Sequence, residues 1–316
     1  MNGAVSISPA AGGTMILSVG EILFDYFPQY RRMGGAPYNF AFHLKKFGFD
    51  VRFVSRVGMD GPGEEIRSAV EGHGFDPYDL QTDPERPTGA VDIILGDRGT
   101  PAFTIRENAA YDRLEVDARL RACLEEPPEL IYFGSLIQRT EEGFETIRRI
   151  LGGRPAGVKT LYDVNLRPGC YSGEIIERSL AEADIVKLNA DELIEIAAVA
   201  GAGGDEQAVC LFLMKKYSVE TLCVTDGPRG SRIYKNGAAF AVSASKDIRV
   251  ADTVGAGDAF ASVLAVGCMR GWEPEKTLRT AGAFAEAVCG IKGALPESAA
   301  FYEPFGELMK KEDYEK

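Results

Sequence analysis

The sequence predicts an α/β protein in which helices cover both faces of a central, mostly parallel β-sheet and a small β-sheet forms a lid. From residue 130 onward, short apolar segments alternate regularly with helical stretches. Such alternation is typical of parallel strands joined by helical crossovers. Between residues 22 and 106, two other segments have the pattern of strands without a helix beside them. We expect these to pair as a separate, antiparallel sheet.

The elements of the main sheet are predicted from apolar runs bounded by turn residues and from helical spacing. Strands are expected at Met15–Gly20, Val51–Val54, 130–133, 160–163, 184–187 and 221–224. Helices are expected at 37–47, 62–72, 141–151, 174–181, 190–199 and 206–216.

The lid is expected to take its strands from about 22–33 and 88–107, with a β-hairpin over 90–106 that turns at the sequence GDRG. Residues 15–316 are then a single domain. Residues 1–14 are rich in Gly, Ser, Ala and Pro, a composition that predicts a disordered tail.

The composition favours a small-molecule partner. The 316 residues include 35 basic and 47 acidic side chains, a net charge of −12, and an acidic protein repels nucleic acid and anionic membranes. Six cysteines without a C-x-x-C pair, and a first segment unlike a secretory signal, predict a reduced, cytoplasmic protein. Because His43 and His73 are the two histidines, a histidine-rich metal site and a Ser-His-Asp triad are disfavoured.

The strongest local motif is a glycine loop that opens an apolar helix. Residues 252–258 have the sequence DTVGAGD and continue directly into AFASVLAVGCMRG. Gly255, Ala256 and Gly257 permit a tight turn, and their N–H groups lie at a helix N-terminus, where the helix dipole attracts negative charge. The loop is predicted to bind an anion, and a phosphoryl group in transfer is an anion that such a loop would stabilise.

Asp258 lies at the rim of this loop, where it would repel phosphate unless it had a chemical role. Taking the proton from an attacking hydroxyl is such a role, and the alternative is that Asp258 only caps the helix. The loop lacks the G-x-x-x-x-G-K-[ST] pattern of a Walker A motif. It also lacks the third glycine and the early position of a dinucleotide fingerprint.

A second glycine pair occurs near the N-terminus, in GGAPYNFA at 34–41. Gly34 and Gly35 allow close approach to a ligand, and Asn39 offers both a donor and an acceptor. Asp25 precedes them on the first lid segment. A carboxylate and an amide that converge on one pocket suit the recognition of several hydroxyl groups.

Together these motifs resemble the ribokinase-like (PfkB) family of sugar kinases. GGAPYNFA is similar to the first signature of that family and DTVGAGD to the second. Between them, NADE at 189–192 and TDGPRG at 225–230 are similar to its N-x-x-E and T-x-G-x-x-G motifs. Segments 20–25, 107–112, 133–139 and 163–168 further resemble the fructokinase branch, although kinases of 2-keto-3-deoxygluconate share parts of them.

The resemblance implies a three-layer ribokinase-like fold and an ATP-dependent kinase that phosphorylates a hydroxyl of a small sugar, with fructose the closest match. Asp258 is then the catalytic base, and the amides of Gly255, Ala256 and Gly257 form the anion hole. The residues implied to bind the sugar are Asp25, Gly35, Asn39, Arg167 and Asp258. Arg167 is also implied to reach the transferred phosphate, and a surface ion pair is its alternative role.

The resemblance also implies where ATP and cations bind. The ATP-binding positions are Lys187, Asn189, Thr225, Gly227 and Gly230, together with Gly255 and Gly257. Lys187 alternatively forms a structural ion pair. Glu192 shares a helical turn with Asn189 and is implied to order water around an ATP-bound Mg²⁺, with a plain surface glutamate as the alternative. A monovalent cation such as K⁺ is implied at Asp252, Val254, Val288, Ile291 and Gly293, but Glu297 stands where a small polar residue is expected.

Other functions stay open on these residues. A kinase of 2-keto-3-deoxygluconate, another sugar or a nucleoside would carry the same motifs. A sensor that binds sugar without turnover is a second alternative, but a sensor has no need for a base at residue 258. Lids of relatives often pair, so a homodimer through the lid is expected.

Overall fold

The structure, a computed structural model, describes residues 15–95, 101–245 and 250–310. The strands of its nine-stranded main sheet are, in spatial order, β13 (Ala238–Val242), β12 (Ser231–Lys235), β11 (Thr221–Thr225), β10 (Ile185–Asn189), β9 (Lys159–Asp163), β8 (Leu130–Gly134), β1 (Ile16–Val19), β4 (Val51–Gly58) and β5 (Leu80–Asp83). The strands from β11 to β5 run parallel, whereas β12 and β13 are antiparallel additions at one edge.

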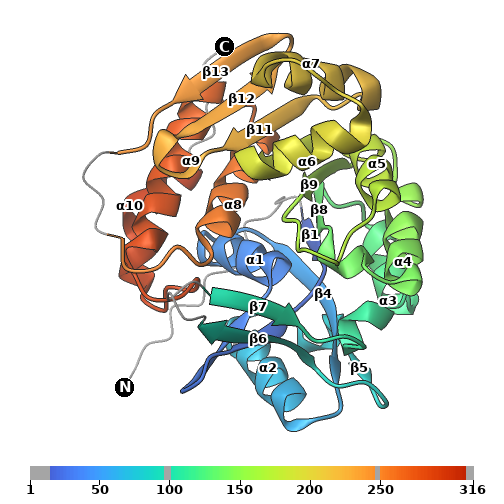
Figure 1. Cartoon of the computed structure of the whole chain (residues 1–316). Coiled ribbons are helices and arrows are strands. Elements are labelled where there is room, and N and C mark those ends of the chain that lie inside the picture. Colours follow the sequence, from blue (N-terminus) through green and yellow to red (C-terminus); the bar gives the residue numbers. More distant parts are fainter. Residues whose placement is uncertain (1–14, 96–100, 246–249, 311–316) are drawn as a thin grey trace.

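Helices cover both faces of this sheet (Figure 1). They are α1 (Ala36–Lys46), α2 (Gly61–Gly72), α3 (Ala118–Glu125), α4 (Glu141–Gly152), α5 (Gly173–Ala181), α6 (Ala190–Ala200), α7 (Glu206–Tyr217), α8 (Ala256–Met269), α9 (Pro274–Cys289) and α10 (Ala299–Lys310). The predicted three-layer α/β architecture is therefore confirmed. Among the described residues, no helix has both the length and the apolar character needed to cross a membrane.

The alternation of side chains along the strands produces the three layers. Leu130 and Tyr132 of β8 pack into a core formed with α1, α2, α8, α9 and α10. Ile131 and Phe133 of the same strand face the opposite way, into a core formed with α3 to α7. Because successive strand residues point to opposite faces, a continuously apolar strand is buried on both sides.

The order of the strands creates a crevice at one edge of the sheet. The chain builds outward from β1 through β4 to β5, and then returns to the other side of β1 and builds outward from β8 to β13. At such a reversal the loops diverge, and open α/β sheets bind ligands outside the carboxyl ends of their strands there.

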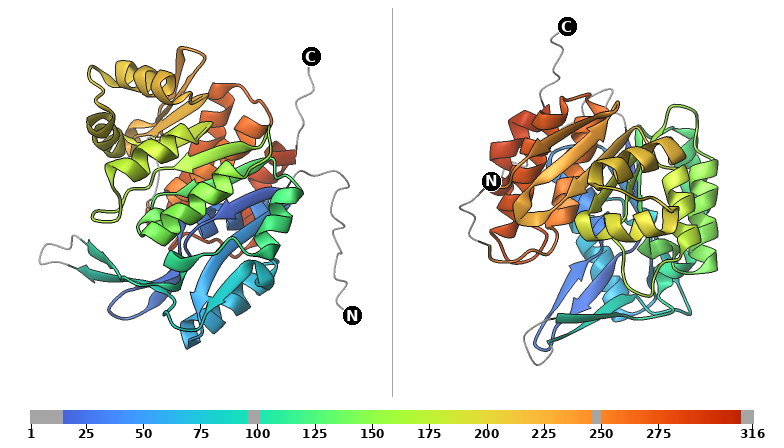
Figure 2. Two further views of the ribbon diagram at one scale, coloured as in Figure 1. Left: turned by 90° about the vertical axis from the view of Figure 1, so that its right-hand side faces the viewer. Right: turned by 45° about the horizontal axis from the view of Figure 1, so that its top comes forward.

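The second sheet is the lid, and it projects from the main body (Figure 2). Its strands, in spatial order, are β3 (Arg31–Gly34), β2 (Leu23–Tyr26), β6 (Gly89–Leu95) and β7 (Pro101–Ile105). The pairs β2–β3 and β6–β7 are antiparallel, as predicted, but β2 and β6 pair in parallel. The expectation of a wholly antiparallel lid was therefore wrong, because two separate hairpins lie side by side. The GDRG turn and the tail at 1–14 lie outside the described residues.

A buried ion pair ties the base of the lid to the main body. Arg139 donates to the carboxylate of Asp112 through Nε and Nη2, both at 2.8 Å. The side chains are 7% and 4% exposed, respectively. Nη2 of Arg139 also donates to the carbonyl of Arg106 at 2.7 Å, directly after β7. The guanidinium also lies 5.1 Å from the ring centre of Tyr111. Arg139 therefore contacts both ends of the segment from Arg106 to Asp112, which follows β7.

We predict that Arg139→Met lowers the free energy of unfolding by about 3–5 kcal/mol, because it leaves Asp112 buried without its charge partner. Denaturant unfolding measures this change. The matched control is Arg148→Met, which breaks an exposed pair with Glu145 on α4 and should cost less than about 1 kcal/mol. Equal losses in the two variants would contradict a structural role for the buried pair.

Candidate active site

The residues singled out by the sequence gather at the carboxyl edge of the sheet. Asn189 ends β10 and Thr225 ends β11. Two carboxylates that the sequence did not single out lie at the same edge, because Asp163 ends β9 and Glu21 follows β1. Helix α8 starts at the same edge, with Gly255 as its N-cap residue at φ 79°. A Cβ at Gly255 would lie 2.3 Å from that of Ala294, so both the backbone angle and the space require glycine.

Helix α8 begins without a side-chain cap. The N–H of Ala256 donates to the carbonyl of Thr253 at 3.3 Å, and no side chain accepts from the N–H groups of the first turn. Uncapped N–H groups of this kind bind anions at helix N-termini. Asp258 is the third residue of the helix, and it is not the N-cap that the alternative interpretation required. The capping role is thus excluded, and the carboxylate stands at the rim of the loop.

Asp258 contacts the first glycine motif directly. Asn39 of α1 donates from Nδ2 to Oδ2 of Asp258 at 2.7 Å, which joins residues 219 positions apart. Helices α1 and α8 lie side by side in the core (Figure 1), and this packing brings the two motifs together. Burial raises the pKa of Asp258 to about 6, and the nearby Asp163 carboxylate adds to the rise. Asn39, Lys187 and Arg167 oppose it.

A buried ion pair lies beneath the glycine loop. Lys187 of β10 donates from Nζ to Asp163 at 3.0 Å, and Tyr132 donates its hydroxyl to the other Asp163 oxygen at 3.0 Å. Burial alone would lower the pKa of Lys187, but Asp163, Glu192 and Asp258 raise it, so the ammonium is retained. A Cβ at Gly257 would be 3.1 Å from Nζ. Lys187 therefore forms a structural ion pair with Asp163, and its ammonium group also lies next to Gly257 of the glycine loop.

Asp25 of β2 provides a carboxylate on the lid side. The side chain is half-buried and hydrogen-bonds to none of the described residues. Burial raises the pKa of Asp25 to about 6, whereas Arg167 and Arg32 lower it. A Cβ at Gly34 would lie 2.8 Å from Oδ2 of Asp25, so the glycine keeps this carboxylate accessible. Gly35, at φ 117°, packs against the carbonyl of Glu21 and closes the base of the lid.

Glu21, a buried carboxyl two residues after the end of β1, is a site residue that was not predicted from the sequence. It is 4% exposed, and its Oε2 has no partner among the described residues. Burial raises the pKa of Glu21 to about 7, and Asp258 adds to the rise. Two further buried atoms, Oδ1 of Asn39 and the hydroxyl of Tyr111, also lack partners within the described part of the chain. Glu21 belongs to segment 20–25, which resembles the fructokinase branch, and this segment and its place after the first strand were the available signals.

Arg167 extends from the loop after β9 and is exposed. Its Nη1 donates to the carbonyl of Leu166 at 3.2 Å. Its charge lowers the pKa of Glu21, Asp25 and Asp258, so it faces the carboxylates of the site. The alternative role, a surface ion pair, is not found among the described residues.

The residues expected to bind nucleotide line the next strands of the same edge. Asn189 and Glu192 form a capping box at the start of α6. The second Glu192 oxygen accepts from the N–H of Leu166 at 2.9 Å, which fixes the loop that carries Arg167. Thr225 ends β11 and donates to the carbonyl of Leu188 at 3.3 Å. Gly227 and Gly230, at φ 51° and 99°, shape the turn into β12.

Most residues of the expected cation site are brought together by one packing contact. The Asp252 segment hydrogen-bonds to the end of α9, where Val288 lies buried, through the N–H groups of 251 and 252. Ile291 and Gly293 follow in the next turn. Asp252 Oδ1 accepts from the N–H of Val254 at 3.1 Å, and Oδ2 accepts from that of Gly293 at 3.1 Å and from Arg32 of the lid at 2.9 Å. The positive charge that contacts Asp252 in the structure is therefore the guanidinium of Arg32.

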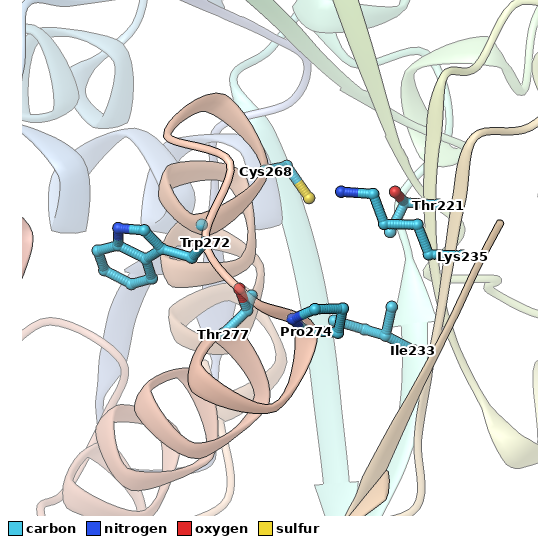
Figure 3. A pocket seen from close by; sticks show the side chains of 8 residues that line it. Thr221, Ile233, Lys235, Cys268, Trp272, Pro274 and Thr277 are labelled. Carbon is cyan, nitrogen blue, oxygen red and sulfur yellow. The ribbon is translucent and has the colours of Figure 1, made fainter. Parts of the chain in front are cut away.

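A separate small pocket lies near the far end of α8 (Figure 3). It is lined by Thr221, Ile233, Lys235, Gly267, Cys268, Trp272, Pro274 and Thr277. Cys268 and Asp258 are ten positions apart on one helix, which corresponds to about 15 Å. Burial raises the pKa of the Cys268 thiol to about 12, so it is an unreactive thiol. The pocket takes no part in the site described above.

A glycine loop at a helix N-terminus, an adjacent carboxylate and an amide that contacts it are parts of a small-molecule kinase. The model of the pfkB family of carbohydrate kinases matches residues 29–299. The chain belongs to this family and is a PfkB sugar kinase.

The relatives agree with this assignment. A putative sugar kinase of Pyrococcus horikoshii, PH1459, is 28% identical over 81% of this chain and 83% of its own length. Fructokinase-2 of Oryza sativa subsp. japonica is 27% identical over 91% of both chains. The structure of a Xylella fastidiosa fructokinase with bound ATP is similar in fold, with a TM-score of 0.80, 22% identity, and coverage of 92% and 98% of the two chains. That of a Thermotoga maritima 2-dehydro-3-deoxygluconokinase has a TM-score of 0.79, 18% identity, and coverage of 93% and 98%.

We predict that Asp258→Asn melts at or above the temperature of the unmodified protein at about pH 7.5. The pKa of Asp258 is raised from 3.8 to about 6 in the folded state. The folded protein therefore binds the carboxyl proton of Asp258 more tightly than the unfolded chain does. Above about pH 6 the carboxylate is ionised in both states, and its charge destabilises the folded state. The gain should shrink as the pH falls towards about 4.

The control is Glu195→Gln on the exposed side of α6, which should leave the melting temperature unchanged at either pH. A variant at residue 258 that melts well below the unmodified protein would show that the carboxylate stabilises the fold instead.

Proposed function

We propose that this sugar kinase transfers the γ-phosphate of ATP to a hydroxyl of fructose, with Asp258 as the base. The observation that carries the proposal is the 2.7 Å contact between Asn39 and Asp258. It joins a carboxylate with a pKa raised to about 6 to the first glycine motif, beside an uncapped helix N-terminus. A base with such a pKa is ionised at neutral pH and still accepts a proton.

The roles of the surrounding residues follow from this geometry. Asp25 and Asn39 would hold sugar hydroxyls, and Arg167 would contact the sugar or the phosphate in transfer. The amides of Gly255, Ala256 and Gly257, with Lys187 beneath them, would stabilise the charge that develops on the phosphoryl oxygens. Thr225, Gly227, Gly230 and Asn189 would border the nucleotide. In-line transfer requires little more than such positioning and charge stabilisation.

A neutral sugar fits the pocket better than a sugar acid. Glu21 and Asp25 both lie on the substrate side, and burial raises the pKa of each. Binding a carboxylate there would add another negative charge to a region that already resists ionisation. The fructokinase relatives at 27–28% identity support the same preference. A 2-keto-3-deoxygluconate kinase remains the second candidate, because Arg167 is exposed and its guanidinium suits a carboxylate.

The residues present fit a Mg²⁺ ion that keeps most of its water. No cluster of three or more His, Cys, Asp or Glu among the described residues could hold a metal by itself. Glu192 is 8% exposed and uses its oxygens on backbone N–H groups, so it would act on the ion through water. When bound, Mg²⁺ neutralises phosphate charge. Glu192 and Asn189 would hold the water molecules around the ion.

A homodimer through the lid stays a prediction. Phe103 of β7 is 59% exposed and Tyr30, in the β2–β3 turn, is 47% exposed, and exposed aromatic residues of this kind favour association.

We predict that Asp258→Asn lowers kcat with fructose by at least about 10²-fold, the low end for a lost general base. In the unmodified protein, kcat/KM should rise with pH up to about 6 and level off above it. ADP release measured with fructose, 2-keto-3-deoxygluconate, other sugars and nucleosides checks both activity and substrate choice.

A higher kcat/KM for 2-keto-3-deoxygluconate than for fructose would identify 2-keto-3-deoxygluconate as the substrate and would not affect the role of Asp258 as the base. Near-normal turnover by the folded Asp258→Asn variant would remove the base assignment whatever the sugar. Sugar binding without ADP release from any substrate would instead support a sensor.

We predict that Glu192→Gln raises the Mg²⁺ concentration for half-maximal activity by about tenfold, as loss of an outer-shell partner does. The measurement is a magnesium titration at fixed ATP. Asp191→Asn is the control, because Asp191 is the exposed neighbour on the same turn. A midpoint that does not move would remove Glu192 from the magnesium shell.

A further inference from the structure

Asp252, at the start of the glycine loop, is bound by the lid. Arg32 of β3 donates from Nη1 to Asp252 Oδ2 at 2.9 Å, across 220 positions of sequence. The same oxygen accepts from the N–H of Gly293, and the other accepts from that of Val254. Both oxygens of the Asp252 carboxylate are therefore hydrogen-bonded, and the positive charge that balances this carboxylate is the guanidinium of Arg32.

The guanidinium is held in place on several sides. A Cβ at Gly293 would lie 3.6 Å from Nη1 and 3.8 Å from Cζ of Arg32, so the group covers the turn after α9. Its Cζ is 4.9 Å from the ring centre of Tyr30 and 5.7 Å from that of Phe27. The side chains of Arg32 and Asp252 are 30% and 22% exposed, so the pair is partly shielded from water and salt.

Arg32 also faces the substrate side of the site. It is the direct cross-strand partner of Asp25 in the lid, and its charge lowers the pKa of that carboxyl. One side chain thus connects the sugar side of the lid with the loop that forms the anion hole. These contacts are with the residues where a monovalent cation was expected, and they conflict with that expectation.

We propose that Arg32 is a positioning residue that acts as a tethered cation of Asp252, in place of a monovalent ion. A carboxylate beside the anion hole repels the phosphoryl group unless a positive charge neutralises it. A guanidinium is permanently charged and planar, and it is attached to the chain, so its effective concentration exceeds that of a free ion. A K⁺ ion at this carboxylate would have to share it with the guanidinium and with two backbone N–H groups, and the two positive charges would repel each other. The activity is therefore independent of K⁺.

Removing Arg32 should create a cation requirement that the unmodified protein lacks. The test compares initial rates of ATP-dependent phosphorylation in KCl and in tetramethylammonium chloride at constant ionic strength. The unmodified protein should differ less than about twofold between the two salts. Arg32→Ala should lose at least about tenfold in tetramethylammonium, and K⁺ should restore the rate in a saturable manner.

The matched control is Arg31→Ala. Arg31 is on the same strand, and its ion pair is with Glu65 of α2 rather than with the glycine loop. This variant should respond to the two salts as the unmodified protein does. Arg32→Lys keeps a charge at the site and should stay independent of K⁺, which separates charge from general damage to the lid.

Thermal melting gives a readout that needs no sugar or ATP. K⁺ should raise the melting temperature of Arg32→Ala by a few degrees relative to tetramethylammonium, about 2–4 °C, and should not affect the unmodified protein. This result is independent of the proposed substrate, so a wrong sugar and a wrong role for Arg32 are distinguishable.

Three results would overturn the proposal. The first is an unmodified protein whose rate rises severalfold with K⁺. The second is an Arg32→Ala variant with full activity in tetramethylammonium. The third is an Arg32→Ala variant that loses activity without recovery or thermal stabilisation by K⁺, because that outcome assigns Arg32 to the lid structure alone.

Discussion

The close grouping of carboxylates around one helix N-terminus is the constraint on which the rest of this structure depends. Glu21, Asp25, Asp163 and Asp258 face a common region, and burial raises the pKa of three of them. Asp163 is fully buried, and it is balanced by Lys187. The ion pair therefore removes one negative charge and places an ammonium under the loop where phosphate charge would develop. Burial is the largest cause of the raised pKa of Asp258, the Asp163 carboxylate adds to it, and Lys187 opposes it.

Local sequence patterns were sufficient to predict most of the fold. Continuously apolar segments such as 130–133 are strands buried on both faces, and short apolar runs of this kind between helical stretches are typical of a parallel sheet. The hairpin of β12 and β13 was missed although Asn236 and Gly237, both at positive φ, are a known turn signal. The parallel pairing of β2 and β6 was missed for a different reason, because no local pattern specifies which edges of two hairpins meet.

The features of the site likewise divide into local motifs, which the sequence shows, and contacts between distant segments, which it does not show. The glycine loop and the N-x-x-E motif of Asn189 and Glu192 are local, so they could be found in the sequence, whereas the capping box that these two residues form was found in the structure. The contacts of Arg32 with Asp252 and of Arg139 with Asp112 join distant segments. Asp252, Asp112 and Arg139 lie in segments that the sequence analysis named, but no local pattern specifies which side chain each of them contacts. Glu21 lies in a segment that the sequence analysis named, but its place at the site follows from the sheet order, in which β1 is central and flanked by β4 and β8.

The two arginine contacts give the lid two attachments of different character. The Arg139 pair is almost fully buried, with side chains 7% and 4% exposed, whereas the Arg32 pair is 30% and 22% exposed. Breaking a buried pair leaves an uncompensated charge, but a partly exposed pair can exchange its partner for water at a smaller cost. The contact at the base of the lid should therefore cost more to break than the contact with the glycine loop. An element attached in this way can open for substrate and still return to one position, which in-line transfer requires.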